Sequence, residues 1–230
     1  MSKNLKTRVE TDSLGEIKVP KDALWGAQTQ RAIENFPISG IKFKFPFGRS
    51  FLKALGVIKY SAAIANNDLG ILSNKKSEAI KSAAKKVING DVDDHFPIDI
   101  FQTGSGTSTN MNANEVIANL ASAKLKDQIS PNDEVNMSQS SNDTIPTAIC
   151  ISALLDMKEL LLPGLDVLIK EIDKKEAKLK GVVKTGRTHL MDAMPIEFSQ
   201  ELSAWSAQLR GCKNSLNYSF KRLSELPQGG

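Results

Sequence analysis

Apolar residues recur every three or four positions along most of the chain, which predicts a mainly helical protein. The spacing is clearest in segments 50–69, 73–88, 145–162, 165–183 and 198–223. Segment 145–162 is apolar on nearly all sides, so we expect a helix buried on more than one face. The last segment alternates steps of three and four residues, which is typical of a helical bundle seam. Its apolar positions are Phe198, Leu202, Trp205, Leu209, Cys212, Leu216, Phe220 and Leu223.

The first part of the chain has shorter and more mixed patterns. Val9, Ile17 and Val19 predict a short β-hairpin, with its turn at 12–15. Residues 36–47 are rich in Phe, Pro and Gly and are expected to be irregular. The pattern shifts to long helices near residue 144. We therefore predict an N-terminal domain at 1–144 and the first, incomplete part of a long-helix bundle domain at 145–230.

Composition and charge narrow the class of protein. The 230 residues have a net charge of +4 and no basic stripe with interleaved aromatics, which disfavours nucleic-acid binding. No apolar run reaches the roughly 20 residues that span a bilayer, and the N-terminus lacks the apolar core of a signal peptide. Cys150 and Cys212 lie in helical runs without metal-binding spacing, so we expect buried free thiols and a cytoplasmic protein.

Three polar stretches stand out as candidate binding elements. TGSGT (103–107), QSSND (139–143) and GRTH (186–189) each place small hydroxyl or amide side chains beside a predicted helix start. Free N–H groups and the positive end of the dipole make a helix start suited to a small carboxylate or phosphate. Simple N-capping explains any one stretch, because Ser, Thr and Asn are the preferred caps. Three such clusters together favour a binding site.

His189 is the candidate acid or base, because histidine titrates near neutral pH. We expect it at the head of the long helix that follows; the alternative is a histidine that only satisfies a neighbouring group. His95, in an acidic loop, is expected to be solvated or structural. GSGT lacks the Lys-Ser/Thr ending of a nucleotide-binding loop, and we find no cluster of metal ligands. The predicted chemistry therefore uses no cofactor and no metal.

Five segments together resemble the class II fumarase family, within the fumarase/aspartase superfamily. They read RVETDSLGEIKVP, ALWGAQTQRAIENF, FQTGSGTSTNMNANEVIAN, VNMSQSSNDTIPTA and KTGRTHLMDAMPIEFSQELSAW. The resemblance implies a mostly helical homotetramer with a central bundle of long helices, whose active sites each draw on three subunits. It also implies reversible anti addition of water to fumarate, giving (S)-malate, as in the tricarboxylic acid cycle.

The same resemblance assigns roles to individual residues. It implies that His189 is the proton donor and acceptor, acting through a bound water. Residues 130–133 fall where the family has a second dicarboxylate site, although fumarases usually have histidine at the position of Ser130. The implied contacts to the substrate carboxylates are Ser105, Gly106, Thr107, Ser140, Ser141, Asn142 and Thr188, and the implied second site is Ser130, Pro131, Asn132 and Asp133.

Two alternatives stay open. Aspartate ammonia-lyases resemble this chain but typically read GAGT, STND and GRTQ, whereas this chain has Ser105, Ser141 and His189. A non-catalytic helical assembly module that kept the binding turns is the other. The family's third signature, a Gly-Ser-Ser loop followed by a Lys-x-Asn segment, does not occur in this sequence. We therefore expect the N-terminal half of a fumarase, as a fragment or as one part of a split enzyme, and no activity from the chain alone.

Overall fold

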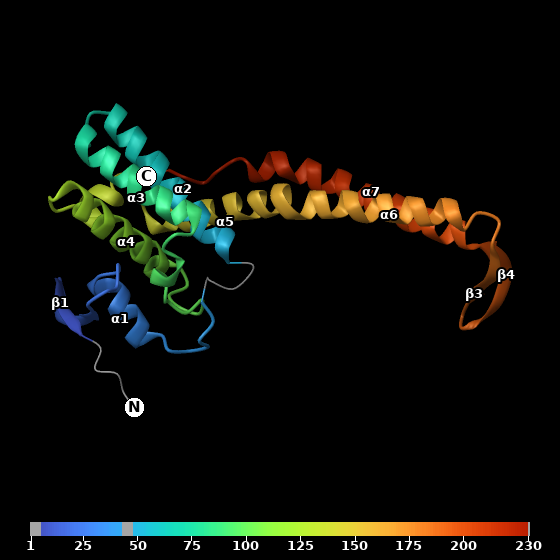
Figure 1. Ribbon diagram of the computed structural model, residues 1–230, viewed down its shortest axis with the longest axis horizontal. Coiled ribbons are helices and arrows are strands. Elements are labelled where there is room, and N and C mark those ends of the chain that lie inside the picture. The colour runs from blue at the N-terminus through green and yellow to red at the C-terminus, as the bar shows by residue number, and fades with distance from the viewer. Residues whose placement is uncertain (1–5, 43–47, 230) are drawn as a thin grey trace. The chain divides into compact units, whose positions relative to one another are not determined.

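The computed structural model describes residues 6–42 and 48–229 and is mostly helical (Figure 1). The chain forms two compact units. The first comprises residues up to Ser152 together with the segment from Leu226, and the second runs from Ala153 to Glu225. The elements are, in order, β1 (Thr7–Asp12), β2 (Gly15–Pro20), α1 (Ala27–Asn35), α2 (Arg49–Asp68), α3 (Asn74–Asn89), the 3-10 turn η1 (Asp93–His95), α4 (Thr107–Leu125), the π-helical turn η2 (Pro131–Val135), α5 (Ser141–Asp156), the π-helical turn η3 (Met157–Leu161), α6 (Leu162–Lys178), β3 (Val183–Thr188), β4 (Met191–Glu197) and α7 (Phe198–Leu223).

The first hairpin forms where the sequence predicts it. β1 and β2 pair antiparallel around a two-residue loop, and Gly15 takes a positive φ of 105° that suits glycine. Asp12 Oδ1 accepts the N–H of Leu14 at 2.9 Å inside the turn. The Arg31 guanidinium also donates to both Asp12 carboxylate oxygens, which lowers the pKa of Asp12. This ion pair holds the hairpin against α1. Residues 36–42 form neither helix nor strand, as predicted, and the rest of the predicted irregular segment, 43–47, lies outside the described residues.

Helices α2, α3 and α4 supply the core of the first unit. Gly56 lets α2 approach α3 closely, because a Cβ there would lie 2.9 Å from Ile88 Cγ1. Helix α3 has the predicted ends: the Ser73 hydroxyl accepts a backbone N–H at its start, and Gly90 closes it with a φ of 88°. The buried apolar side chains include Leu52, Leu55, Ile58, Ile80, Ala84, Val87, Val116 and Ile117.

Two buried carboxylates tie loops to this core. Glu115 of α4 accepts the N–H groups of Gly26, Gln28 and Thr29 at 2.8, 2.9 and 3.1 Å, so it caps the start of α1. Asp99 fixes the segment before the Gly-Ser-Gly-Thr turn. Burial alone would raise its pKa, but hydrogen bonds from Phe101 N–H and from the hydroxyl and N–H groups of residues 39–40 lower the pKa to about 2.

In the second unit, α6 and α7 run side by side, and the β3–β4 hairpin joins them at one end (Figure 1). Pro163 lies in the first turn of α6, where its missing N–H costs little. The π-helical turn η3 precedes it and connects α5 to α6. Asp173 of α6 accepts the Ser206 hydroxyl at 2.5 Å and also contacts Arg210 of α7, while Lys213 pairs with Asp166. Polar contacts thus fix the register of the helix pair.

The expected burial of segment 145–162 on more than one face is wrong for this chain. Ile149 and Leu160 are 55% and 66% exposed, so parts of the segment are not buried. The predicted seam of α7 is half-buried at Leu202 and Leu209, whereas Trp205 and Cys212 are exposed, so the expectation of a buried Cys212 is also wrong. Within residues 6–42 and 48–229, no helix combines the length and apolar character needed to cross a bilayer.

Candidate functional site

The Gly-Ser-Gly-Thr turn leads directly into α4, as the sequence predicts. Gly106 stands at the N-cap with a φ of 67°, which favours glycine. A Cβ at this position would also lie 3.0 Å from the Ile145 side chain, so two independent constraints select glycine. The hydroxyls of Ser105 and Thr107 are 2.9 Å apart and exposed. The turn therefore presents two hydroxyls and the start of a helix to a ligand.

The Ser-Ser-Asn turn starts α5 in a similar way. The Ser140 carbonyl accepts the first helical N–H groups, and its hydroxyl accepts the N–H of Asn142 at 3.2 Å. The Ser141 hydroxyl accepts a hydrogen bond from Asn110 Nδ2 at 2.9 Å. Ser140 and Ser141 are half-buried and Asn142 is exposed. Capping uses only part of this donor set, and the remaining hydroxyl protons and the Asn142 amide can reach a ligand.

The two turns are neighbours. The Gly106 backbone approaches Ile145 in the first turns of α5, and Asn110 of α4 reaches Ser141 across the same junction. Two helix starts therefore lie side by side, each lined by hydroxyl or amide groups. A small ligand with carboxylate oxygens could receive hydrogen bonds from both.

A buried lysine underlies this junction, and the sequence reasoning missed it. Lys59 of α2 is fully buried, and its Nζ donates to Asn136 Oδ1 and Gln139 Oε1, both at 2.9 Å. Burial lowers the pKa of Lys59 to about 7. The signal was present, because Lys59 and Asn66 interrupt the spacing of apolar positions that begins at Leu52 in this helix.

The third polar stretch is not at a helix start, so that prediction is wrong. Gly186 and Thr188 lie in β3, and α7 begins only at Phe198. His189 and Leu190 form the tip of the β3–β4 hairpin with φ angles of 50° and 62°. Such a two-residue turn needs positive φ at both positions. The antiparallel pairing of β3 with β4 extends to Glu197, so the helical spacing takes effect only from Phe198.

The hairpin presents its tip to solvent. His189 is exposed and Leu190 is 98% exposed. Gly186 is needed for the pairing of the strands, because a Cβ there would lie 2.6 Å from the Met194 carbonyl oxygen. Thr188 and His189 belong to the second unit, whereas the other predicted contact residues belong to the first.

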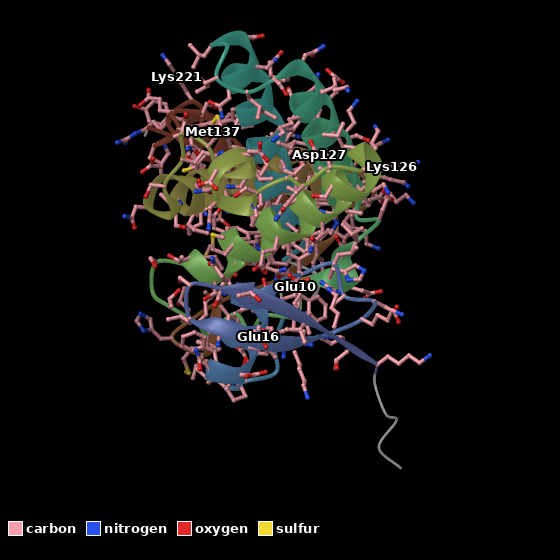
Figure 2. All side chains as sticks on the ribbon, turned by 90° about the vertical axis from the view of Figure 1, so that its left-hand side faces the viewer. Glu10, Glu16, Lys126, Asp127, Met137 and Lys221 are labelled. Atoms are coloured by element: carbon pink, nitrogen blue, oxygen red, sulfur yellow. The ribbon has the colours of Figure 1, made fainter. Side chains whose placement is uncertain are left out.

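The predicted second site forms the start of η2. The Ser130 hydroxyl accepts the Asp133 N–H at 3.1 Å and donates to Asp133 Oδ2 at 2.8 Å. Pro131 and Asn132 line a cavity of about 740 Å³. Glu10 of the first hairpin and the residues Lys126 and Asp127 after α4 also line this cavity. Figure 2 labels these three residues. Ser130 and Asp133 thus cap a turn, while their neighbours face the cavity.

His95 is expected to be either solvated or structural, and the structure gives it a structural role. Its Nδ1 accepts the Leu24 N–H at 3.2 Å, and its carbonyl accepts Asn112 Nδ2 at 3.0 Å. Burial lowers the pKa of His95, which suits a neutral ring that accepts a hydrogen bond. Among the described residues, no group of three or more His, Cys, Asp or Glu side chains is arranged to hold a metal ion.

These features belong to a known class of protein. The chain is a member of the lyase family, whose sequence pattern matches residues 15–230. The match includes both helix-start turns and the His189 hairpin.

More specifically, the chain is similar to class II fumarate hydratases. The one from Xylella fastidiosa (strain 9a5c) is 56% identical over 230 residues, which are 100% of this chain and 48% of the relative. The one from Halobacterium salinarum is 54% identical over 228 residues, 97% of this chain and 48% of the relative. The crystal structure of a class II fumarase from Schistosoma mansoni matches with a TM-score of 0.91 at 38% identity, over 96% of this chain and 47% of that one. The chain spans about half the length of the curated relatives it matches.

Proposed function

We propose that this protein is a fumarate hydratase that adds water reversibly and in anti fashion to fumarate, giving (S)-malate in the tricarboxylic acid cycle. The observation that carries the proposal is the junction of the two polar turns, where Asn110 joins the start of α4 to Ser141 at the start of α5. A dicarboxylate needs several donors without bulky side chains, and this junction supplies hydroxyls, amides and helix N–H groups. The names of the relatives give the substrate its identity.

In this proposal, Ser105–Thr107 and Ser140–Asn142 bind the substrate carboxylates, together with Thr188. Glycine at position 106 lets a carboxylate approach the backbone. The serine hydroxyls donate to carboxylate oxygens and hold the double bond in a fixed orientation, which lowers the entropic part of the barrier.

His189 handles the proton of the attacking water. In hydration, the attacking water bonds through its oxygen to one alkene carbon and passes one proton through a second, bound water to the imidazole, while a separate acid protonates the other carbon. In dehydration the imidazolium returns that proton through the second water to the departing hydroxyl, which leaves as water, and the conjugate base of the separate acid takes the proton from the other carbon. An imidazole can both accept and donate a proton, so one side chain serves both directions. The exposed hairpin tip leaves His189 accessible to a substrate bound elsewhere in an assembled enzyme.

We also infer a homotetramer in the cytoplasm, in which residues 145–230 form part of a central helical bundle and residues 1–144 a separate domain. The exposed apolar side chains of the helices, such as Leu160 and Trp205, are suited to contacts between copies. Residues 130–133 are proposed as a second dicarboxylate site of low affinity, because the Ser130 hydroxyl is already engaged with Asp133.

The test is an assay of the natural gene product, as the cell makes it, with fumarate and with aspartate. Loss of fumarate absorbance with formation of (S)-malate supports the proposal. Release of ammonia from aspartate without fumarate hydration would favour an aspartate ammonia-lyase. Absence of both activities from a folded oligomer would favour the non-catalytic assembly module. Ser141→Ala is expected to raise the KM for fumarate, because it removes one donor to the carboxylate.

A further inference from the structure

Lys59 is an unusual residue for the interior of the first unit. A buried ammonium group is costly unless it is paired, and its two hydrogen-bond partners are neutral amide oxygens. Among the described residues, no carboxylate forms an ion pair with it. A methionine would fill a similar volume without this cost, so the fold alone does not account for a lysine here.

The partners of Lys59 lead directly to the proposed substrate turns. Asn136 Oδ1 accepts hydrogen bonds from Lys59, Asn110 and Asn114, at 2.9, 3.2 and 3.1 Å. The Asn136 amide nitrogen donates to the Gln139 carbonyl at 3.1 Å, which orients the side chain. The same Asn110 amide nitrogen donates to Ser141 at 2.9 Å.

The second partner of Lys59 lies still closer to the turn in sequence. Gln139 immediately precedes Ser140, and its amide nitrogen donates to the carbonyls of Val135 and Met137. Lys59 thereby fixes the side chain that begins the Ser-Ser-Asn turn. Its charge reaches the hydroxyl of Ser141 through only two bridging side chains, Asn136 and Asn110.

We propose that Lys59 is a positioning residue for the substrate: through Asn136 and Gln139 it fixes the Ser-Ser-Asn turn, and its buried positive charge stabilises a dicarboxylate bound there. This inference rests on the proposed function. A bound anion supplies the counter-charge that Lys59 lacks inside the chain, and in return the anion favours the protonated lysine. The desolvation cost of the lysine is then offset in the complex.

The experiment compares a dianion with a monoanion of the same shape. Dissociation constants for succinate and monomethyl succinate are measured calorimetrically on the natural gene product, unsubstituted and as Lys59→Met. One unit charge at roughly 10 Å in an effective dielectric of about 20 predicts a loss of the order of tenfold per carboxylate, so about tenfold for the monoester and about a hundredfold for succinate. A purely structural role would weaken both ligands by the same factor. Equal losses, or no loss, would overturn the inference.

Two further variants keep the test decisive. Lys75→Met removes one charge from an exposed lysine on α3 and is expected to leave both constants unchanged. Asn136→Asp keeps Lys59 and its acceptor but places a carboxylate beside the ammonium group. This variant should also weaken succinate more than the monoester, and unchanged selectivity in a folded Asn136→Asp protein would contradict the inference even where Lys59→Met does not fold.

The same measurements separate this inference from the proposed function. If the unsubstituted protein neither hydrates fumarate nor binds succinate, the proposed function fails and the role of Lys59 fails with it. If the unsubstituted protein does both and the Lys59→Met variant keeps its KM and its selectivity, only the role of Lys59 is wrong.

Discussion

Replacing Lys59 by methionine should change how the stability of the first unit depends on pH. Burial lowers the pKa of Lys59 to about 7 in the folded chain, from 10.5 for an ordinary lysine. The unfolded chain therefore binds more protons than the folded chain between these two values. The destabilising contribution of the charged lysine is fully present below pH 7 and disappears as the pH rises toward 10.5.

The magnitude follows from the two pKa values. One extra proton in the unfolded state raises the free energy of unfolding by about 1.4 kcal/mol per pH unit. At pH 7 the difference is about half a proton, and by pH 8 it is close to one. The unsubstituted chain should therefore gain about 2 kcal/mol relative to Lys59→Met between pH 7 and 9. Loss of the hydrogen bonds to Asn136 and Gln139 adds an offset of about 1–3 kcal/mol that does not vary with pH.

Urea denaturation followed by tryptophan fluorescence measures this difference. Trp25 lies in the first unit, and the chain's other tryptophan, Trp205, can be replaced by phenylalanine in every form compared. Lys75→Met is the matched control, because it removes an exposed charge, and its offset from the unsubstituted chain should stay constant with pH. Parallel pH profiles for the unsubstituted chain and Lys59→Met would refute the reasoning.

Three further perturbations probe the surroundings of the candidate site. Gly106→Ala should lower the free energy of unfolding by about 1–3 kcal/mol, because position 106 has a positive φ and an added Cβ would crowd Ile145. Gly104→Ala is the control and should have little effect, because a Cβ there meets nothing within 4 Å. Equal urea midpoints for the two variants would show that position 106 does not require glycine. Glu115→Gln should lower the free energy of unfolding by about 2 kcal/mol or more in the same assay, because it weakens three hydrogen bonds at the start of α1. Glu78→Gln, at an exposed position, is its control, and similar losses in both variants would argue against a cap by Glu115. Asp99 should titrate near pH 2 by NMR, and because its pKa is lowered, its stabilising contribution is present above pH 4 and is lost as the pH falls toward 2; an ordinary titration near pH 4 would exclude the hydrogen-bonded loop.

Much of the fold could be predicted because local signals and tertiary packing agree. The first hairpin has alternating strand formers and a glycine where the turn needs a positive φ. Helix α3 has a serine at its start and a glycine at its end, beside a narrow apolar stripe. In both cases the turn or capping residues determine where the element begins or ends, and the spacing of the apolar residues determines which side is buried.

The failures have an equally physical origin. The His189 turn has neither glycine nor asparagine at its two positive φ positions, so its sequence carries no signal for a tight hairpin turn. The exposure of Ile149 and Leu160 depends on which neighbours are present, which the spacing of apolar residues does not contain. The helical spacing places Lys59 on the buried side of its helix, but the polar partners that accept its hydrogen bonds lie 77 and 80 positions away and cannot be identified from the helix alone.

The role of His189 in proton transfer is decided by the rate of fumarate hydration by the natural gene product with His189 and with His189→Asn. We expect the unsubstituted protein to convert fumarate to (S)-malate, and the variant to lose about a hundredfold or more of kcat while keeping its oligomeric state. A variant that hydrates fumarate at the unsubstituted rate would remove His189 from the mechanism.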